Sequence, residues 1–149
     1  MFRKVIFAAI YAAVLFPAAF AQTAPYGTAE EARAMLEKAV VAVKADKAKA
    51  LDMFNKGEGG FKDRDLYVFC ANAFDGINTA HPTLKGAKLT DIKDVSGFAL
   101  GEEIMRTATE EMISEITYMW PRPGSDTPVQ KVTYVTKVGD QICGVGYYK

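Results

Sequence analysis

The chain has 149 residues, and its 18 lysines and arginines balance its 18 aspartates and glutamates, so the formal net charge is zero. Nothing in this balance favours nucleic-acid binding, for which a basic stripe would be expected. The length allows one domain with a hydrophobic core of its own, and no low-complexity tract interrupts it, so we expect a single folded globular domain.

The N-terminus has the pattern of a secretory signal peptide. Basic residues at positions 3 and 4 precede an apolar run over residues 5–16, Pro17 ends the run, and residues 19–21 (Ala-Phe-Ala) form a small-x-small cleavage site. The run is shorter than the ~20 residues that a membrane-spanning helix needs. This argues against the alternative of an uncleaved membrane anchor.

We therefore expect a signal peptide over residues 1–21 and one domain over residues 22–149, located in the periplasm or secreted. Export places Cys70 and Cys143 in an oxidising compartment, where disulfides persist. Their spacing leaves two interpretations open. They form a disulfide, or they are two buried free thiols that pack as small apolar residues.

A helix is predicted directly after the signal peptide. Thr28 and Glu31 have the spacing of a capping box, apolar residues recur at helical spacing as far as Phe54, and Gly57 supplies a stop. The pattern predicts one long helix. Its apolar stripe packs on its own domain or, in the N-terminal half, pairs with a second copy or another protein.

The remainder of the chain predicts strands joined by short turns. Asp75 and Gly76 form a two-residue hairpin signal between the first two strands. A loop over residues 83–94 and a helix over residues 97–111 separate the second strand from the third. Because hairpins join most of the strands, we predict an α+β domain with an antiparallel sheet. The five predicted strands cover residues 66–74, 77–81, 115–120, 129–138 and 141–148.

The sequence carries no recognisable catalytic or metal-binding motif. It has no G-x-S-x-G, H-E-x-x-H or phosphate-binding loop, and no C-x-x-C pair. His81 is the one histidine, and no sequence cue supplies the second group that acid–base catalysis requires. We expect neither an enzyme nor a cofactor or metal site. His81 is either a ligand contact or a structural residue bonded to loop backbone.

Several short motifs recur in the order found in a known family: Asp-Leu-Tyr-Val-Phe at 65–69, Ala-His-Pro at 80–82, Tyr-Met-Trp-Pro at 118–121 and Gly-Val-Gly-Tyr-Tyr at 144–148. In their order and spacing they resemble the single Cache domains, which are extracytoplasmic PAS-like sensor modules. The resemblance implies a long N-terminal helix packed on a five-stranded antiparallel sheet. It also implies that the first and last strands are neighbours, which fits a Cys70–Cys143 disulfide and leaves both interpretations of the cysteines open. Because the chain ends at Lys149, we expect a free-standing member without an output domain.

The strands supply candidate residues for a ligand pocket. Tyr67 and Phe69 share one face of their strand by period two, and Tyr118 and Trp120 share a face of another. Burying the charge of Lys131 in a central strand costs free energy unless the charge is solvated or paired. A cation beside phenol and indole donors suits a small carboxylate, and the resemblance implies a roof formed by residues 83–94. The predicted ligand-binding residues are Tyr67, Phe69, His81, Tyr118, Trp120, Lys131 and Tyr134, the last requiring a bulge or twist to face Lys131.

These observations predict a sensory domain, active in signal transduction or chemoreception, that binds a small organic acid. The alternative is a non-catalytic interaction module that docks on a membrane receptor without a small-molecule ligand.

Overall fold

The computed structural model describes residues 24–149, so the predicted signal peptide over residues 1–21 lies outside the described part of the chain. Six antiparallel strands form one sheet in the order β1-β2-β6-β5-β4, and β3 also pairs with β2. The strands are β1 (Lys62–Asp63), β2 (Leu66–Asn72), β3 (Asn78–Ala80), β4 (Ser114–Pro121), β5 (Pro128–Val138) and β6 (Gln141–Tyr148). The helices are α1 (Ala29–Ala45), α2 (Lys47–Lys56), the 3₁₀ turn η1 (Leu89–Asp91) and α3 (Leu100–Thr107).

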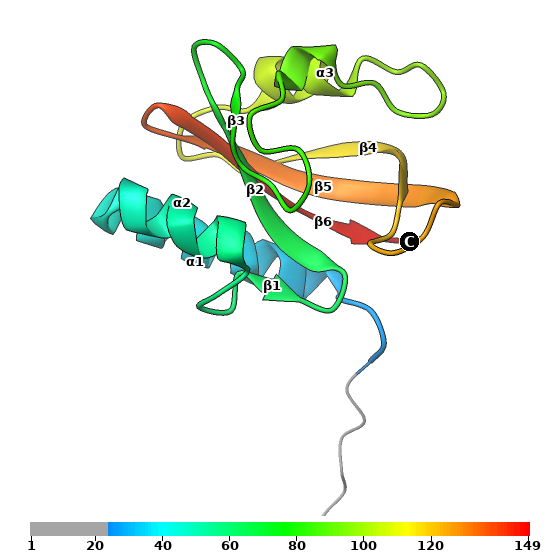
Figure 1. The fold of residues 1–149 in the computed structure, drawn as a ribbon, viewed down its shortest axis with the longest axis horizontal. Coiled ribbons are helices and arrows are strands. Elements are labelled where there is room, and N and C mark those ends of the chain that lie inside the picture. The colour runs from blue at the N-terminus through cyan, green and yellow to red at the C-terminus, as the bar shows by residue number, and fades with distance from the viewer. Residues whose placement is uncertain (1–23) are drawn as a thin grey trace, which may run out of the picture.

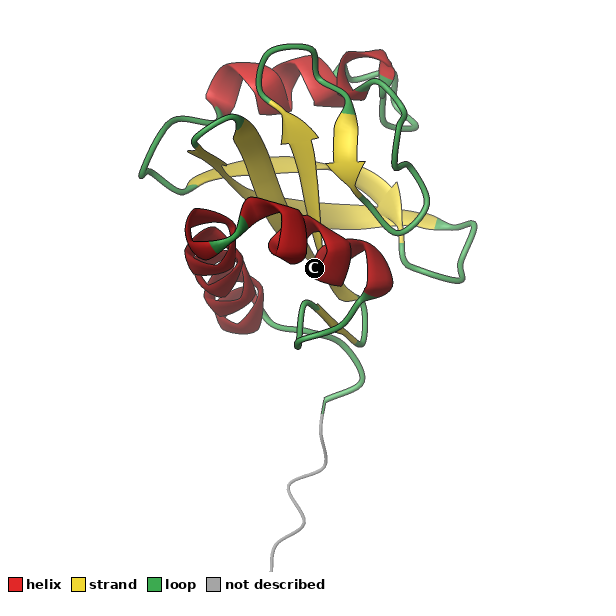
Figure 2. Ribbon diagram, turned by 60° about the vertical axis from the view of Figure 1, so that its left-hand side comes forward, coloured by secondary structure: helices red, strands yellow, loops and turns green. Residues whose placement is uncertain are grey.

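The elements form three layers with the sheet in the middle. Helices α1 and α2 cover one face, and η1 with α3 covers the other (Figures 1 and 2). This arrangement confirms the predicted α+β, PAS-like fold, in which the two-residue strand β1 extends the five predicted strands. None of the helices within residues 24–149 has the length and apolar character needed to cross a membrane.

The prediction of one long N-terminal helix was wrong, because the chain bends at Asp46. This residue ends α1 and begins α2 in an extended conformation (φ −159°, ψ 95°), and its carboxylate accepts a hydrogen bond from the Lys49 amide at 3.1 Å. The bend allows α1 to pack along β5 and β6 while α2 packs on β2 and β3. A straight helix of the same length would leave the twisted sheet. The predicted capping box at Thr28 and Glu31 is present.

The helix predicted over residues 97–111 is also shorter, since only Leu100–Thr107 is helical. Gly97 has a φ of +86°, which breaks the helix at its start. Beyond its end the chain pairs with β5, where the Thr109 carbonyl accepts a hydrogen bond from the Lys137 amide at 3.0 Å.

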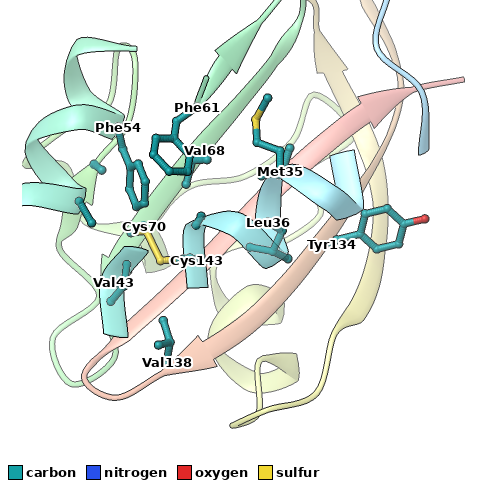
Figure 3. Packing of buried hydrophobic residues seen from close by; sticks show 14 of the residues in the cluster. Met35, Leu36, Val43, Phe54, Phe61, Val68, Cys70, Tyr134, Val138 and Cys143 are labelled. Carbon is teal, nitrogen blue, oxygen red and sulfur yellow. A yellow bond between two sulfur atoms is a disulfide. The ribbon is translucent and has the colours of Figure 1, made fainter. Parts of the chain in front are cut away.

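The core beneath α1 and α2 contains the two cysteines (Figure 3). Cys70 on β2 and Cys143 on β6 are directly opposite in the strand register, with Cα atoms 4.1 Å apart, and they form a disulfide. This confirms the disulfide interpretation over that of free thiols. The apolar stripe of α1 is buried in the same core, so it packs on its own sheet along its whole length.

We expect the disulfide to contribute substantially to stability because it closes a long loop. The two cysteines are 73 residues apart, and loop-closure entropy alone predicts about 4 kcal/mol for such a bridge, with measured losses of about 2–5 kcal/mol for native disulfides. The double variant Cys70→Ala with Cys143→Ala should lower the free energy of unfolding in denaturant by this amount. Equal unfolding curves for the wild type with and without reductant would contradict it.

Candidate ligand-binding site

A small cavity lies between the sheet and the layer of η1 and α3. Its volume is about 30 Å³, which is room for a molecule the size of water. Aromatic residues of the sheet face apolar residues of the covering layer across it. The sheet side contributes Tyr67, Phe69, Tyr118 and Trp120, the covering side contributes Leu84, Leu89, Ile92, Leu100 and Ile104, and Asn78 and His81 complete the wall.

A larger groove of about 230 Å³ adjoins the cavity near the end of β4. It shares Tyr67, His81 and Trp120 with the cavity and is otherwise lined by residues 82–83 and 121–123. These three shared residues therefore form the boundary between the two spaces.

The covering layer is held to the sheet by Asp94. One carboxylate oxygen accepts hydrogen bonds from the Ser96 hydroxyl and the Ser96 and Phe98 amides, and the other accepts from the Met119 amide on β4 at 3.0 Å. The Ser96 hydroxyl, followed by the Met119 amide, lowers the pKa of Asp94 to about 2. Gly101 allows the close approach within the layer, because a Cβ atom there would lie 1.5 Å from the Leu89 carbonyl oxygen.

His81 has a tautomer set by its own loop. Its Nδ1 accepts hydrogen bonds from the Thr83 and Leu84 amides, both at 3.0 Å, so the ring proton is on Nε2 and this N–H is the donor left for a ligand. Burial, and then the charge of Lys131, lowers the pKa of His81 to about 4, so the ring is neutral at ordinary pH. His81 thus forms the predicted loop bonds and also lines the cavity.

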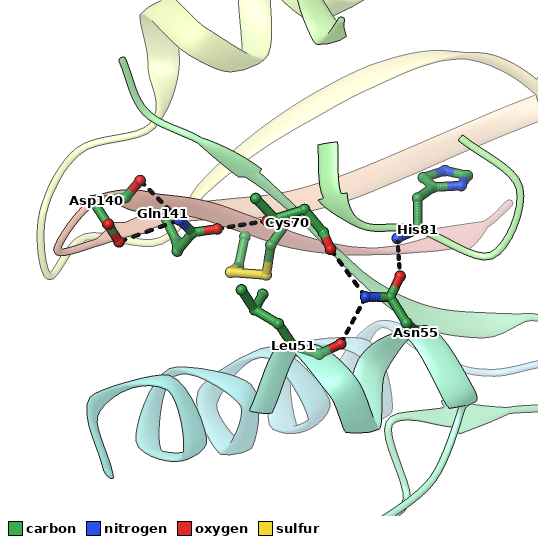
Figure 4. Close-up of a disulfide and its surroundings, with 8 residues drawn as sticks. Leu51, Asn55, Cys70, His81, Asp140 and Gln141 are labelled. Atoms are coloured by element: carbon green, nitrogen blue, oxygen red, sulfur yellow. Dashed lines mark hydrogen bonds between the residues drawn. A yellow bond between two sulfur atoms is a disulfide. The ribbon is translucent and has the colours of Figure 1, made fainter. Parts of the chain in front are cut away.

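The position of His81 is fixed from the helical layer by Asn55 on α2. The Asn55 side chain accepts a hydrogen bond from the His81 amide at 3.3 Å and donates to the Leu51 and Thr79 carbonyls (Figure 4). Asn55 therefore joins α2 to the end of β3, where His81 begins the loop of the covering layer.

Lys131 is almost completely buried, with 1% of its surface exposed. Its ammonium donates to the Tyr67 hydroxyl at 3.0 Å and lies 4.4 Å and 4.8 Å from the ring centroids of Tyr67 and Tyr148. Gly146 on β6 leaves space for it, since a Cβ atom there would lie 2.3 Å from the Lys131 Cε. Burial lowers the pKa of Lys131 to about 7, and the nearby charge of Asp65 opposes this shift.

The structure brings six of the seven predicted residues together in one region. Five of them line the cavity, and Lys131 contacts one of these five, Tyr67. Lys131 lines neither the cavity nor the groove, and its hydrogen bond to a lining residue is the one to the Tyr67 hydroxyl. Tyr134 lies on the opposite face, where its ring is 5.9 Å from the Arg33 guanidinium of α1 and 5.8 Å from the Tyr147 ring. The register of β5 is regular, so the bulge that would turn Tyr134 toward Lys131 is absent from this strand.

Asp65 is a residue near the site that the sequence did not indicate. It accepts a hydrogen bond from the Gly27 amide at 2.7 Å, and its second oxygen lies 3.6 Å from the Arg122 Nε. The Arg122 guanidinium stacks between the rings of Tyr26 and Tyr148, at 4.2 Å and 5.0 Å. The start of β2 and the end of β4 meet at one end of the antiparallel sheet, and only the strand order reveals this.

Small antiparallel sheets with a covered pocket of this kind define the PAS-like class of sensor domains. Residues 23–147 match the model of the family described as Single Cache domain 2. The chain belongs to this family.

Individual relatives are chemotaxis proteins. A stretch of 74 residues is 34% identical to methyl-accepting chemotaxis protein McpP of Pseudomonas putida and covers 48% of this chain but only 14% of that receptor. A methyl-accepting chemotaxis protein of Vibrio parahaemolyticus has the same fold, with a TM-score of 0.64 and 24% identity over 80% of this chain and 86% of its own. A Cache chemosensory domain studied for carboxylic acid recognition has a TM-score of 0.58 and 25% identity, over 80% of this chain and 86% of its own.

We expect Asp94→Ala to loosen the covering layer. The variant loses four hydrogen bonds to a buried carboxylate and should lower the free energy of unfolding by about 2 kcal/mol, since bonds to charged groups contribute about 1.5–3 kcal/mol each and partly re-form with water. Amide hydrogen exchange should rise across residues 83–99. Asp91→Ala, at an exposed position of η1, is the matched control and should change neither quantity. Unaltered exchange in Asp94→Ala would exclude this role.

Proposed function

We propose that this domain binds a small organic acid at the boundary between the cavity and the groove, as a chemosensory module outside the cytoplasm. The observation that carries the proposal is the set of donors at that boundary. The Tyr67 hydroxyl and the Nε2–H of neutral His81 are the donors available there, the Trp120 side chain interacts with Tyr67, and Lys131 donates to the Tyr67 hydroxyl. No aspartate or glutamate lines either space, so the site favours a negative ligand.

Tyr67 connects the buried charge to the ligand. Its oxygen accepts the hydrogen bond from Lys131, which leaves its own proton to be donated toward a carboxylate. Hydrogen bonds to ionised groups are about twice as strong as neutral ones. The result is a chain from ammonium through phenol to carboxylate, beside a second donor on His81.

The apolar walls limit the remainder of the ligand. The cavity and groove, at about 30 and 230 Å³, are smaller than the ~300–1,000 Å³ of pockets that hold drug-sized molecules. An acid with a few carbon atoms fits this space, with its chain against Phe69 and Leu89. The Cache chemosensory domain studied for carboxylic acid recognition supports the same ligand class, and the chemotaxis relatives support the sensory setting.

The small volume of the cavity favours a second candidate, in which the domain docks on a membrane receptor without a small molecule. The two candidates separate in a thermal-shift screen against short carboxylates, amino acids and amines. A ligand at 100 times its dissociation constant should add about 2.7 kcal/mol of stability. A flat screen would overturn the acid-binding proposal and leave the docking module.

Tyr67→Phe should weaken binding of the acid found in this screen by about 10- to 150-fold, because it removes a hydrogen bond to a charged group worth about 1.5–3 kcal/mol. The ring stays, so the packing around it should persist, although Lys131 loses the hydroxyl that accepts its hydrogen bond. Calorimetric titration measures the change. Tyr134→Phe makes the same chemical change on the opposite face and should bind as the wild type does. Equal affinities of Tyr67→Phe and the wild type would remove Tyr67 from the site.

A further inference from the structure

We propose that the site takes up a proton together with its carboxylate, and that the proton is received by the Nζ of Lys131. The inference rests on the acid-binding function proposed above and concerns how that site responds to pH.

The geometry around Lys131 leaves its ammonium poorly compensated. An ammonium has three N–H donors, and the Tyr67 hydroxyl is its one hydrogen-bond acceptor among the protein groups of residues 24–149. No ion pair to Lys131 forms within the same part of the chain. Burying a charge without a counter-ion is costly, and such a group lowers the cost by losing its proton.

The groups that face Lys131 come from every strand around it. Tyr67 on β2, Tyr118 on β4 and Tyr148 on β6 have raised pKa values because they are buried. His81, after β3, has a pKa lowered to about 4. The opposite charges of Asp65 and Arg122 lie at the edge of the site. The pKa of Lys131 itself is lowered to about 7. Of Lys131 and the facing groups with a shifted pKa, it is the one that titrates between pH 6 and 8.

A bound carboxylate changes this balance. Its negative charge near the Lys131–Tyr67 pair favours the ammonium, so the pKa of Lys131 is higher in the complex than in the free protein. No covalent bond forms or breaks. Neutral Lys131 gains one proton from solvent, and the ligand remains a carboxylate, so the buried site gains no net charge.

The affinity for the carboxylate falls as the pH rises through the free pKa of Lys131. Below about pH 6, Lys131 is protonated with and without ligand, so affinity is constant. Above its free pKa, each binding event must add a proton, and affinity falls by up to tenfold per pH unit. In that range, occupancy follows the product of carboxylate and proton concentrations. The domain then responds to the undissociated acid rather than to the total acid.

Calorimetric titration of the purified protein with propionate, whose carboxyl group is ionised throughout, tests this proposal. At pH 8.0, heats measured in phosphate and in Tris should differ by the uptake of close to one proton per propionate. At pH 6.0, phosphate and imidazole should show almost none. With a free pKa of about 7, the dissociation constant should rise about tenfold from pH 6.0 to 8.0.

The variants assign the proton. Lys131→Met keeps the length of the side chain and should bind more weakly and without proton uptake at pH 8.0, while Lys85→Met, at an exposed lysine of the covering loop, should match the wild type. Propionate binding by the wild type without proton uptake at pH 8.0 overturns this inference and leaves the acid-binding function intact. Uptake that persists in Lys131→Met overturns the role of Lys131. No heat with propionate or any other short acid overturns both proposals.

Discussion

The pairing of β2 with β6 is the interaction on which the other parts of this structure depend. It joins the first long strand, β2, to the last strand, β6, along five residue pairs. Cys70 and Cys143 face each other at the middle of this pairing and lock its register covalently. The same pairing places the other face of β2, with Tyr67 and Phe69, beside the glycines of β6. Both the core beneath the helices and the candidate site therefore follow from one strand pair.

Because side chains alternate along these strands, the two faces of the sheet carry different sets of residues. One face of β2, β5 and β6 is closed by α1 and α2 over an apolar core that contains the disulfide. On the other face, Gly144 and Gly146 occupy positions where a Cβ atom would meet Phe69 or Lys131. The missing side chains create the volume that the lysine and the aromatic rings fill.

Burying a lysine whose ammonium has a single hydroxyl acceptor costs free energy, which is unusual in so small a domain. Its aromatic neighbours offset part of this cost, because an ammonium over a ring is attracted to the negative face of the ring. Asp65 adds a more distant opposite charge. Neither replaces a counter-ion in contact. Under the proposed function, an anionic ligand supplies this missing counter-ion.

The sequence by itself determined the secondary structure where the signal is local. The capping box at Thr28, the stop at Gly57 and the strand over residues 141–148 are read from spacing and turn residues. Local pattern was not enough at Asp46, where the helix breaks, because a charged residue on an exposed face fits a continuous helix equally well. In the folded domain Asp46 caps α2, and the two helices pack on different strands of the sheet.

The candidate site shows the same division. Period two along each strand grouped Tyr67 with Phe69 and Tyr118 with Trp120, since that alternation is a property of the backbone. It also separates Lys131 from Tyr134 unless a bulge intervenes, and only the register of β4, β5 and β6 established that β5 is regular. The contact of Lys131 with Tyr67, 64 residues earlier, and the approach of Arg122 to Asp65 depend on strand order. Tertiary structure decided them because contacts between distant segments leave no periodic trace in the sequence of either one.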